Sequence, residues 1–400
     1  MHRLMIEVVE NSAHRLPKWQ LVFILAALAA LGPLSIDMYL PAFPDLQRAF
    51  NTTAGPLGAT LATFFVGLCL GQLIYGPLSD RVGRKKPLLF GLALYIAASL
   101  GCAMATGIES LLVLRFFQGL GSCSGMVVGR ALVRDLFSPT ETAQVFSTVM
   151  LVMGIAPILA PLFGQAVASH LGWRYIFYAV AAFAIVVWLG VVRLIPDRVS
   201  DKPGRGWSLT TFWEILCDRR FMGFAIAGTC LQSGLFAYIT GFPTVVIEHF
   251  GFSPRAFSLL FGVNAVGLIG ASQLNSWLLR RYTYTQIIEA VISVATLAGA
   301  LVAYEAWHGF QSPLALLVPL FFFVASLGMA FPNSTAGALA EQGHQAGSAS
   351  ALLGTIQYGG AALASAAVGA LNHYTLTGMG WIIAGCSVLS LVAFRVLLRD

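Results

Sequence analysis

The sequence has little charge. Only 10% of its 400 residues are Asp, Glu, Lys or Arg, whereas 58% are hydrophobic, and the mean hydropathy is +0.79. A soluble domain carries about 25% charged residues, so this chain lacks the polar surface that a water-soluble fold needs. The composition therefore excludes a soluble globular protein and predicts a protein that crosses a membrane several times.

The sequence also lacks the patterns typical of metal sites, disulfide frameworks and common hydrolases. Five of the six cysteines lie in apolar stretches, and no CxxC pair is present. There is no HExxH or GxSxG motif, and all seven histidines fall in predicted loops or termini. We therefore expect no metal, no cofactor and no enzymatic activity, and a membrane-embedded enzyme is the least favoured alternative.

Long apolar runs dominate what is present. Each run has about 20 residues, enough at 1.5 Å per residue to cross a hydrocarbon core of about 30 Å as a helix. Barrel strands need only about ten alternating residues, so the run length favours helices. The predicted fold class is an all-α membrane protein with twelve transmembrane helices. They cover residues 19–41, 56–78, 87–106, 109–130, 142–167, 175–195, 221–246, 257–279, 286–304, 314–335, 349–371 and 380–397.

The basic residues are distributed unevenly among the predicted loops. Of the 23 Lys and Arg residues, 19 fall in the termini, the central linker and alternate loops, three fall in the other loops, and Arg115 lies within a helix. Because Lys and Arg concentrate on the cytoplasmic side of a membrane, both termini are predicted to be cytoplasmic. We call this side the inner face. The net charge of +6 then reflects topology, and no nucleic-acid partner is expected.

The longest polar segment divides the chain into two parts with six predicted helices each. We predict an N-terminal half at 1–195, a cytoplasmic linker at 196–220 with a short amphipathic helix at 208–217, and a C-terminal half at 221–400. The segment YLPAFP at 39–44 resembles YITGFP at 238–243, and both lie at the outer end of the first helix of a half. We interpret the halves as pseudo-symmetric repeats, which are typical of many transporters.

Two charged residues lie inside predicted helices. Asp37 is the only charged residue of 21–41, and Arg115 is the only one of 111–128. A charge at the bilayer centre costs about 2.5–3.5 kcal/mol on an insertion scale, so such residues face protein or water and mark functional sites. Their predicted depths are similar, so we expect them to interact directly or through water or substrate, with Asp37 binding a proton. The alternatives are that Asp37 lies at headgroup depth, or that the two form a static brace.

The loop after the second predicted helix contains GPLSDRVGRKK at 76–86. Gly76 and Gly83 permit tight turns, and Asp80 can pair with Arg81 or Arg84. We interpret this loop as a conformational latch between inner helix ends.

The fifth predicted helix contains GIAPILAPLFG at 154–164. Two prolines inside one span remove backbone donors and kink it. This segment is either a hinge or a tightly packed seam.

These motifs together resemble a known family. The 76–86 loop and RFFQG at 115–119 resemble the helix 2–3 and helix 4 signatures of the major facilitator superfamily. The 154–164 segment is similar to its helix 5 antiporter signature, although the usual Gly-Pro pairs read Ala-Pro here. More narrowly, SIDMYLPA at 35–42, GQLIYGPLSD at 71–80 and AGSASA at 346–351 resemble the Bcr/CflA drug-resistance subfamily. The resemblance covers the whole chain and is densest in the N-terminal half.

The resemblance implies a major facilitator fold and a proton-driven exporter of chloramphenicol- or bicyclomycin-type compounds in a bacterial inner membrane. It assigns proton coupling to Asp37 and Arg115, and the latch to the inner loop. A proton-coupled transporter of a nucleoside or other small metabolite is the nearest alternative, and a passive channel is less favoured. We expect a monomer whose partners are a small-molecule substrate, protons and the lipid bilayer. The expected latch residues are Gly76, Asp80, Arg81, Gly83 and Arg84.

A cavity for amphipathic drugs should be mostly apolar and aromatic, with few polar groups. Residues of these types in the predicted helices are therefore candidates for its lining, although amides also join transmembrane helices and Met or Tyr also packs. The candidates are Met38, Tyr39, Gln72, Gln118, Met126, Phe236, Tyr238, Asn264, Asn333, Gln357 and Tyr358.

Overall fold

The computed structural model describes residues 18–196, 209–342, 345–372 and 377–398. Within these ranges the chain is helical and contains no strand, and twelve spans are long and apolar enough to cross a membrane. The all-α fold class with twelve membrane spans is thus confirmed. The first span combines α2 (Lys18–Asp37), η1 (Leu40–Ala42) and α3 (Phe43–Phe50). The others are α4 (Ala54–Val82), α5 (Lys85–Met104), α6 (Ile108–Leu136), α7 (Pro139–Leu171), α8 (Arg174–Leu194), α10 (Arg219–Pro243) with η2 (Thr244–His249), α11 (Pro254–Leu278), α12 (Tyr284–Trp307), α13 (Pro313–Leu339), α14 (Ala346–Asn372) and α15 (Gly378–Leu398).

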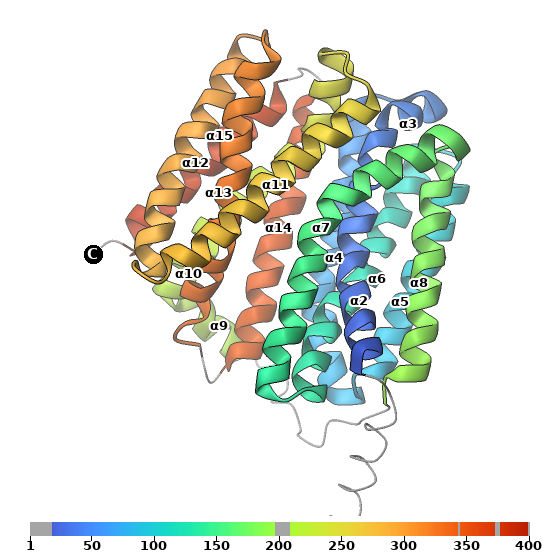
Figure 1. Cartoon of the computed structure of the whole chain (residues 1–400), viewed down its shortest axis with the longest axis vertical. Coiled ribbons are helices and arrows are strands. Elements are labelled where there is room, and N and C mark those ends of the chain that lie inside the picture. Colours follow the sequence, from blue (N-terminus) through green and yellow to red (C-terminus); the bar gives the residue numbers. More distant parts are fainter. Residues whose placement is uncertain (1–17, 197–208, 343–344, 373–376, 399–400) are drawn as a thin grey trace, which may run out of the picture.

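The helices form two bundles that lie side by side (Figure 1). One bundle contains α2–α8 and the other contains α10–α15, and α7 and α11 run next to each other where the bundles meet. Between them, α9 (Leu209–Cys217) corresponds to the predicted short helix at 208–217. Residues 197–208 lie outside the described residues, so the cytoplasmic linker at 196–220 stays a prediction.

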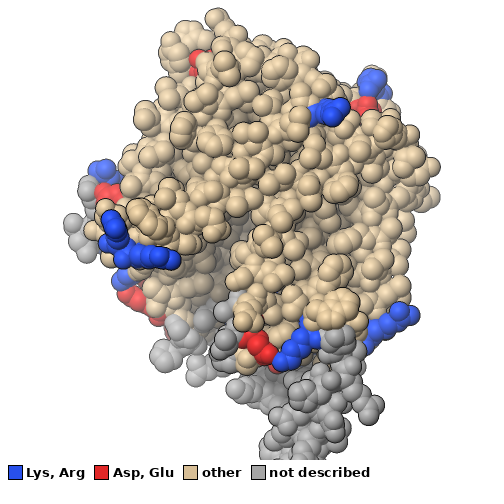
Figure 2. All heavy atoms as spheres, in the orientation of Figure 1, with Lys and Arg blue, Asp and Glu red and all other residues tan. Residues whose placement is uncertain are grey.

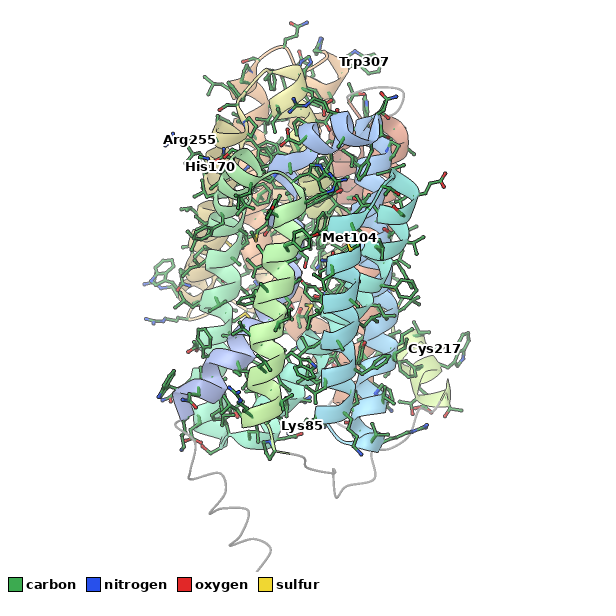
Figure 3. All side chains as sticks on the ribbon, turned by 90° about the vertical axis from the view of Figure 1, so that its right-hand side faces the viewer. Lys85, Met104, His170, Cys217, Arg255 and Trp307 are labelled. Carbon is green, nitrogen blue, oxygen red and sulfur yellow. The ribbon has the colours of Figure 1, made fainter. Side chains whose placement is uncertain are left out.

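Charged side chains gather near the two ends of the bundles. Figure 2 shows a broad uncharged area across one face, with Lys, Arg, Asp and Glu near its margins. Figure 3 shows His170, Arg255 and Trp307 at one end of the molecule and Lys85 and Cys217 at the other. The first end therefore carries loops predicted to be outer, and the second end carries segments predicted to be inner. We call these two ends the outer end and the inner end.

Several helices of the C-terminal half, among them α10, α11 and α12, begin at side chains that cap them. Asp218 and Ser253 accept hydrogen bonds from backbone N–H groups two or three residues later. Thr283 exchanges hydrogen bonds with Gln286, each side chain meeting the other residue's backbone N–H. Such caps satisfy N–H groups that no helical carbonyl reaches, and so they define where α10, α11 and α12 begin.

The first span departs from the single helix that was predicted. Its first helix ends at Asp37, and the chain passes through a turn at Met38 and Tyr39 before η1 and α3. Pro41 and Pro44 occupy the first turns of η1 and α3, where the missing N–H of proline is tolerated. The prediction placed Asp37 inside a helix that ended at one of these prolines. The structure corrects this and places Asp37 at a helix break.

Helices α4 and α6 pack backbone to backbone because glycines face each other's chain. A Cβ built on Gly119 would lie 2.1 Å from the carbonyl oxygen of Phe64, and one built on Gly67 would lie 2.2 Å from that of Phe116. No larger residue fits at these positions, in keeping with the role of small residues in membrane helix packing.

A third close approach lies beside the break in the first span. A Cβ built on Gly164 of α7 would lie 2.1 Å from the carbonyl oxygen of Met38, the residue after Asp37. Helix α7 continues through both Pro157 and Pro161. At Gly164 the predicted seam is therefore a tight contact with the first span, and a hinge role for α7 stays a prediction.

The two halves contact each other at the outer end. Gln47 of α3 donates a hydrogen bond from Nε2 to Oε1 of Glu248 in η2, at 2.6 Å. A Cβ built on Gly58 of α4 would lie 3.3 Å from the Cα of Gly369 in α14. The outer end is thus closed by contacts between α3 and η2 and between α4 and α14.

Replacing Gly164 by alanine tests the contact between α7 and the first span. The clashing atom is a backbone oxygen, which cannot rotate away, so we expect a destabilisation of about 1–3 kcal/mol and a lower melting temperature of the purified protein in detergent. Gly270→Ala in α11 is the matched control, because no atom lies within 4 Å of its built Cβ. The contact would be contradicted if both variants melted at the wild-type temperature.

Candidate functional site

Asp37 is a buried acid at the boundary between the halves. Its side chain is 4% exposed, and η1, which follows it, contacts α10 and α11 of the C-terminal half. Within the described ranges, its carboxyl group has no ion-pair or hydrogen-bond partner. A charged carboxylate is costly in such surroundings unless it is paired. The free energy of ionising Asp37 therefore depends on which groups lie next to its carboxyl group.

A hydrogen-bonded pair faces Asp37 from the C-terminal half. Tyr238 of α10 is close enough to Asp37 for an electrostatic interaction. Asn264 of α11 donates from Nδ2 to the Tyr238 hydroxyl oxygen at 3.0 Å, and both side chains are buried. In this pair the tyrosine hydroxyl acts as an acceptor, so its own proton stays available for another partner. These two predicted cavity residues therefore form a polar pair against the acid.

Arg115 of α6 is fully buried at the centre of the N-terminal half. Its Nη1 donates to the carbonyl oxygen of Ser35 at 3.0 Å and to Oε1 of Gln118 at 2.6 Å. The guanidinium group lies over the rings of Tyr39 and Phe64, with 4.7 and 4.6 Å from Cζ to the ring centroids. A desolvated cation–π contact contributes about 2 kcal/mol. Aromatic faces and neutral acceptors, not a carboxylate, therefore hold this cation.

The acceptors around Arg115 are held by further hydrogen bonds. Gln118 donates from Nε2 to Ser99 Oγ at 2.8 Å, and Ser99 donates to the carbonyl oxygen of Tyr95 at 2.7 Å. The hydroxyl groups of Tyr95 and Ser35 lie 2.5 Å apart. This network joins α2, α5 and α6. It contains Gln118, which was predicted to line the cavity and is instead part of the support for Arg115.

Asp37 and Arg115 do not form an ion pair in this conformation, so the direct contact is absent and the alternative, an interaction through water or substrate, stays a prediction. Arg115 instead binds the backbone of Ser35, two residues before Asp37, while the acid at the helix break faces the C-terminal half. Nε and Nη2 of Arg115 are buried and have no hydrogen-bond partner among the residues that the structure describes. Buried polar groups are normally satisfied, so the two free donors and the unpaired acid mark an incomplete polar arrangement.

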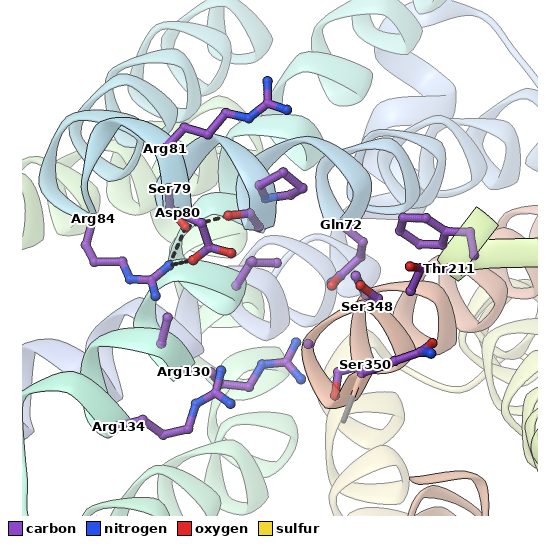
Figure 4. A pocket seen from close by; sticks show the side chains of 18 of the residues that line it. Gln72, Ser79, Asp80, Arg81, Arg84, Arg130, Arg134, Thr211, Ser348 and Ser350 are labelled. Carbon is purple, nitrogen blue, oxygen red and sulfur yellow. Dashed lines mark hydrogen bonds and ion pairs between the residues drawn. The ribbon is translucent and has the colours of Figure 1, made fainter. Parts of the chain in front are cut away.

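An inner cavity of about 520 Å³ lies between the halves at the inner end. Its walls come from α4, α6 and α7 on one side and from α9 and α14 on the other. Figure 4 shows Gln72, Ser348 and Ser350 together on one side of it, with Arg130 and Arg134 near Ser350 and with Asp80 farther away. The molecule is thus closed at its outer end and hollow between the halves at its inner end.

The loop between α4 and α5 holds a cluster of polar contacts. Arg84 pairs with Asp80 and donates from Nη1 to Ser79 Oγ at 2.8 Å (Figure 4). It also donates from Nε to Oδ2 of Asp135 at 2.8 Å. Gly83 has a φ of 88°, a left-handed conformation that favours glycine, and so it permits the turn between α4 and α5. The predicted Asp80–Arg84 pairing is thus present, and the role of this cluster as a latch stays a prediction.

Two expected latch residues occupy other positions. Gly76 lies inside α4, which continues to Val82, so it forms part of the cavity wall and no turn. Arg81 is exposed and forms no ion pair among the described residues, although it also lies at the cavity wall. Arg84 and not Arg81 is therefore the partner of Asp80.

Several predicted cavity residues do lie between the halves. Gln72 lines the inner cavity, and its Nε2 is buried without a partner. Tyr358 of α14 donates its hydroxyl proton to Sδ of Met126 in α6 at 3.6 Å. Phe236 lies between Phe65 and Tyr358, with centroid separations of 4.4 and 6.5 Å. These side chains form an aromatic and amide surface across which the two halves meet.

Other predicted cavity residues have structural contacts instead. Asn333 donates from Nδ2 to Oδ1 of Asn275 at 2.6 Å and thereby joins α13 to α11 within the C-terminal half. Tyr39 shares a hydrogen bond of 2.9 Å with Thr60 besides covering Arg115. The remaining two are Met38, which is buried at the helix break, and Gln357, which is half-buried on α14.

The sequence predictions missed several residues of the inner cavity, among them Arg130, Arg134, Ser348 and Ser350. The two arginines were assigned to a loop because the fourth helix was expected to end at residue 130. Helix α6 instead continues to Leu136, and residues four apart in a helix share one face. Their i, i+4 spacing was the available signal.

Comparisons with known proteins agree with this architecture. The model of the Major Facilitator Superfamily matches residues 22–365. An uncharacterized MFS-type transporter of Bacillus subtilis, YdgK, is 36% identical over 390 residues, which span 95% of this chain and 96% of that protein. A bicyclomycin resistance protein homolog of Haemophilus influenzae is 28% identical over 382 residues, spanning 94% of this chain and 95% of that protein. The crystal structure of a point mutant of the nucleoside transporter NupG superposes with a TM-score of 0.73 at 16% identity, covering 95% of this chain and all of that one.

The chain therefore belongs to the major facilitator superfamily. Within it, the similarity to a bicyclomycin resistance protein homolog agrees with the Bcr/CflA resemblance of the chain's own motifs. The protein is a multi-pass membrane protein of a transporter family. Its candidate transport site consists of the inner cavity, Asp37 at the boundary between the halves and Arg115 inside the N-terminal half.

Replacing Arg84 by glutamine tests the cluster at the α4–α5 turn. Burial lowers the pKa of the Arg84 guanidinium, but the hydrogen bond to Asp135 and the charges of Asp135 and Asp80 outweigh it and raise the pKa overall. The carboxylates are partly exposed, so we expect a destabilisation of about 1–2 kcal/mol, measured by thermal unfolding in detergent. Arg81→Gln removes the same charge from an exposed, unpaired position and should leave the melting temperature unchanged. Equal shifts in both variants would contradict the assignment.

Proposed function

We propose that this protein is a proton-coupled exporter that moves chloramphenicol- or bicyclomycin-type drugs out of the cytoplasm by alternating access. It would lie in a bacterial inner membrane with both termini in the cytoplasm, as the distribution of Lys and Arg indicates. The observation that carries the proposal is Asp37, a buried acid without a counter-charge at a helix break where the two halves meet.

The arrangement of the halves supports export from the inner side. Outer contacts such as Gln47 to Glu248 close the path to the outside, whereas the inner cavity lies at the end predicted to be cytoplasmic. A drug would enter this cavity and meet the aromatic and amide surface of Phe236, Tyr358 and Gln72. The aromatic rings and the amide of this surface suit amphipathic compounds, whereas the inner cavity below it is lined mostly by polar and charged residues. The name of the Haemophilus influenzae relative is consistent with this class of substrate.

Proton coupling would use Asp37 and Arg115 in turn. With its proton bound, Asp37 needs no counter-charge and can lie unpaired at the helix break, as it does here. On losing the proton to the inner side, the carboxylate would gain from an approach to the two free donors of Arg115. The protonated and ionised forms would thus prefer different positions of the chain at the break. A ligand shifts a conformational equilibrium only through such a difference between states.

Proton release from purified protein tests the coupling. Adding chloramphenicol or bicyclomycin to the wild type in weakly buffered detergent solution should release protons, whereas Asp37→Asn should release none. Asparagine imitates the protonated carboxyl, so this variant should still bind the drug, as judged by tryptophan fluorescence. Asp37→Glu, which keeps a titratable group, is the matched control and should retain a measurable release.

The outcomes separate the possible assignments. Undiminished release by Asp37→Asn would remove Asp37 from proton coupling. Release by nucleosides alone, with none by the two drugs, would replace the drug exporter by a metabolite transporter on the same fold. Uptake of the same drugs into inside-out vesicles under an imposed proton gradient would then establish the direction of transport.

A further inference from the structure

We infer that the inner cavity is an electrostatic filter, in which Arg130 and Arg134 admit neutral and anionic substrates from the cytoplasm and repel cationic ones. This inference rests on the proposed function, because it concerns the charge of the substrates that enter the path to be exported. It assigns the selection of substrates by charge to the inner cavity, which Asp37 and Arg115 do not line.

The charge of the cavity wall is strongly one-sided. Four arginines line it, namely Arg81, Arg84, Arg130 and Arg134, against the single carboxylate of Asp80. Arg84 forms ion pairs with Asp80 and with Asp135, and Asp135 is not part of the cavity wall. This pairing neutralises the acid on the wall, so no carboxylate of the described cavity lining balances the charges of the other three arginines.

Neighbouring acids do not offset this excess. Glu141 at the start of α7 pairs with Lys18 at 2.5 Å, and the hydrogen bond from Lys18 lowers its pKa to about 2, helped by Ser138. Glu214 of α9 accepts a hydrogen bond from Gln345, which does line the cavity, but Glu214 itself is not part of the wall. Arg130 and Arg134 form no ion pair within the described part of the chain.

Arg130 lies on the path from the inner end towards the centre. Its Nε donates to the carbonyl oxygen of Met126 at 3.0 Å, which leaves the terminal nitrogens free of that bond. It is close enough to Tyr358 for an electrostatic interaction, and Tyr358 contacts Met126 where the halves meet. A substrate moving from the cavity to this surface therefore passes the guanidinium group of Arg130.

The cavity also offers neutral hydrogen-bonding groups from both halves. Gln72, which is 2% exposed, presents a buried Nε2 donor with no partner. Ser348 and Ser350 of α14 lie on the same side of the cavity (Figure 4). A free amide donor and serine hydroxyl groups in the same cavity as unpaired cations suit a ligand rich in acceptor oxygens, such as nitro, carbonyl, hydroxyl or carboxylate groups.

The preference of Lys and Arg for the cytoplasmic side does not by itself explain this placement. Lys85 and Lys86 contribute to the same bias, yet neither lines the cavity. Lys85 instead donates to the carbonyl oxygen of Val192 on α8. Membrane topology requires cations at the inner end, but only some of them face the space between the halves. A cleft lined by one sign of charge concentrates oppositely charged ligands by factors of about 10–1000.

Charged thiol reagents measure this field without any substrate. The probe site is Ser350→Cys on the cavity wall, in a background whose six natural cysteines are replaced by serine or alanine. Its reaction rates with anionic sulfonatoethyl and cationic trimethylammonioethyl methanethiosulfonate are compared with those of free cysteine. We expect the anionic reagent to be favoured roughly tenfold, and the preference should fall as salt is raised.

Matched variants connect the field to the two arginines. Arg130→Gln with Arg134→Gln should abolish most of the preference, whereas the charge-conserving Arg130→Lys with Arg134→Lys should retain it. If the double glutamine variant does not fold, each single glutamine variant should show a partial loss. Gln311→Cys in the exposed outer loop between α12 and α13 is the reference site and should show no such preference. A preference that is absent at Ser350→Cys, or unchanged by the glutamine variants, would overturn the inference.

A charge series on one drug scaffold extends the test to substrates. Chloramphenicol is neutral, its succinate ester is anionic, and its deacylated amine is cationic. Wild-type protein should bind the neutral and anionic compounds at least about fivefold more tightly than the amine, and the double glutamine variant should lose this difference. Binding of all three compounds with no order by charge would overturn the filter. Binding of none, with the reagent preference intact, would overturn the proposed drug class and leave the filter standing.

Discussion

The burial of Arg115 is the constraint on which the N-terminal half depends. A guanidinium group in a membrane interior must be surrounded by acceptors or aromatic faces, because neither water nor lipid can replace them there. The protein supplies Ser35, Gln118, Tyr39 and Phe64 from three different spans. These spans must approach closely for their side chains to reach one cation. The glycine contacts between α4 and α6 make that approach possible. The packing of the N-terminal half and the burial of Arg115 therefore depend on the same close contacts.

The two halves share a topology but not their charges. The repeat offset that relates Tyr39 to Tyr238 relates Asp37 to Phe236, and Phe236 packs among aromatic rings where the halves meet. The C-terminal half places the neutral, hydrogen-bonded Tyr238–Asn264 pair near Asp37. A neutral partner can accept either protonation state of Asp37 without an ion pair to break. In the proposed mechanism, this asymmetry would confine the change of charge to the N-terminal half while the C-terminal half moves relative to it.

The helices were predictable from the sequence, whereas the pairing of side chains was not. Run length alone determines which segments cross a membrane, and this succeeded for all twelve. A direct Asp37–Arg115 contact, one of the alternatives expected, is absent. The break after Asp37 depends on prolines and on packing against Gly164, which no periodicity reveals. Asn333 and Gln118 were misplaced because an amide in an apolar helix looks the same whether it faces a cavity or a neighbouring helix. Arg130 and Arg134 were missed because a helix that extends beyond the hydrocarbon core carries loop-like residues on its last turns.

The two sets of charges lie at different places along the proposed path, and this separation bears on mechanism. If a cationic drug and the proton competed for Asp37, exchange would follow directly from their mutual exclusion. Here the cavity wall carries unpaired cations, and Asp37 lies at the outer-side break, away from that wall. A neutral or anionic drug would not stabilise the ionised carboxylate of Asp37 electrostatically, so its charge would not displace the proton. Coupling in this protein would instead be conformational, because drug and proton would each stabilise a different arrangement of the two halves. The helix break after Asp37 contacts the C-terminal half, so a change in that arrangement would change the surroundings of the buried acid.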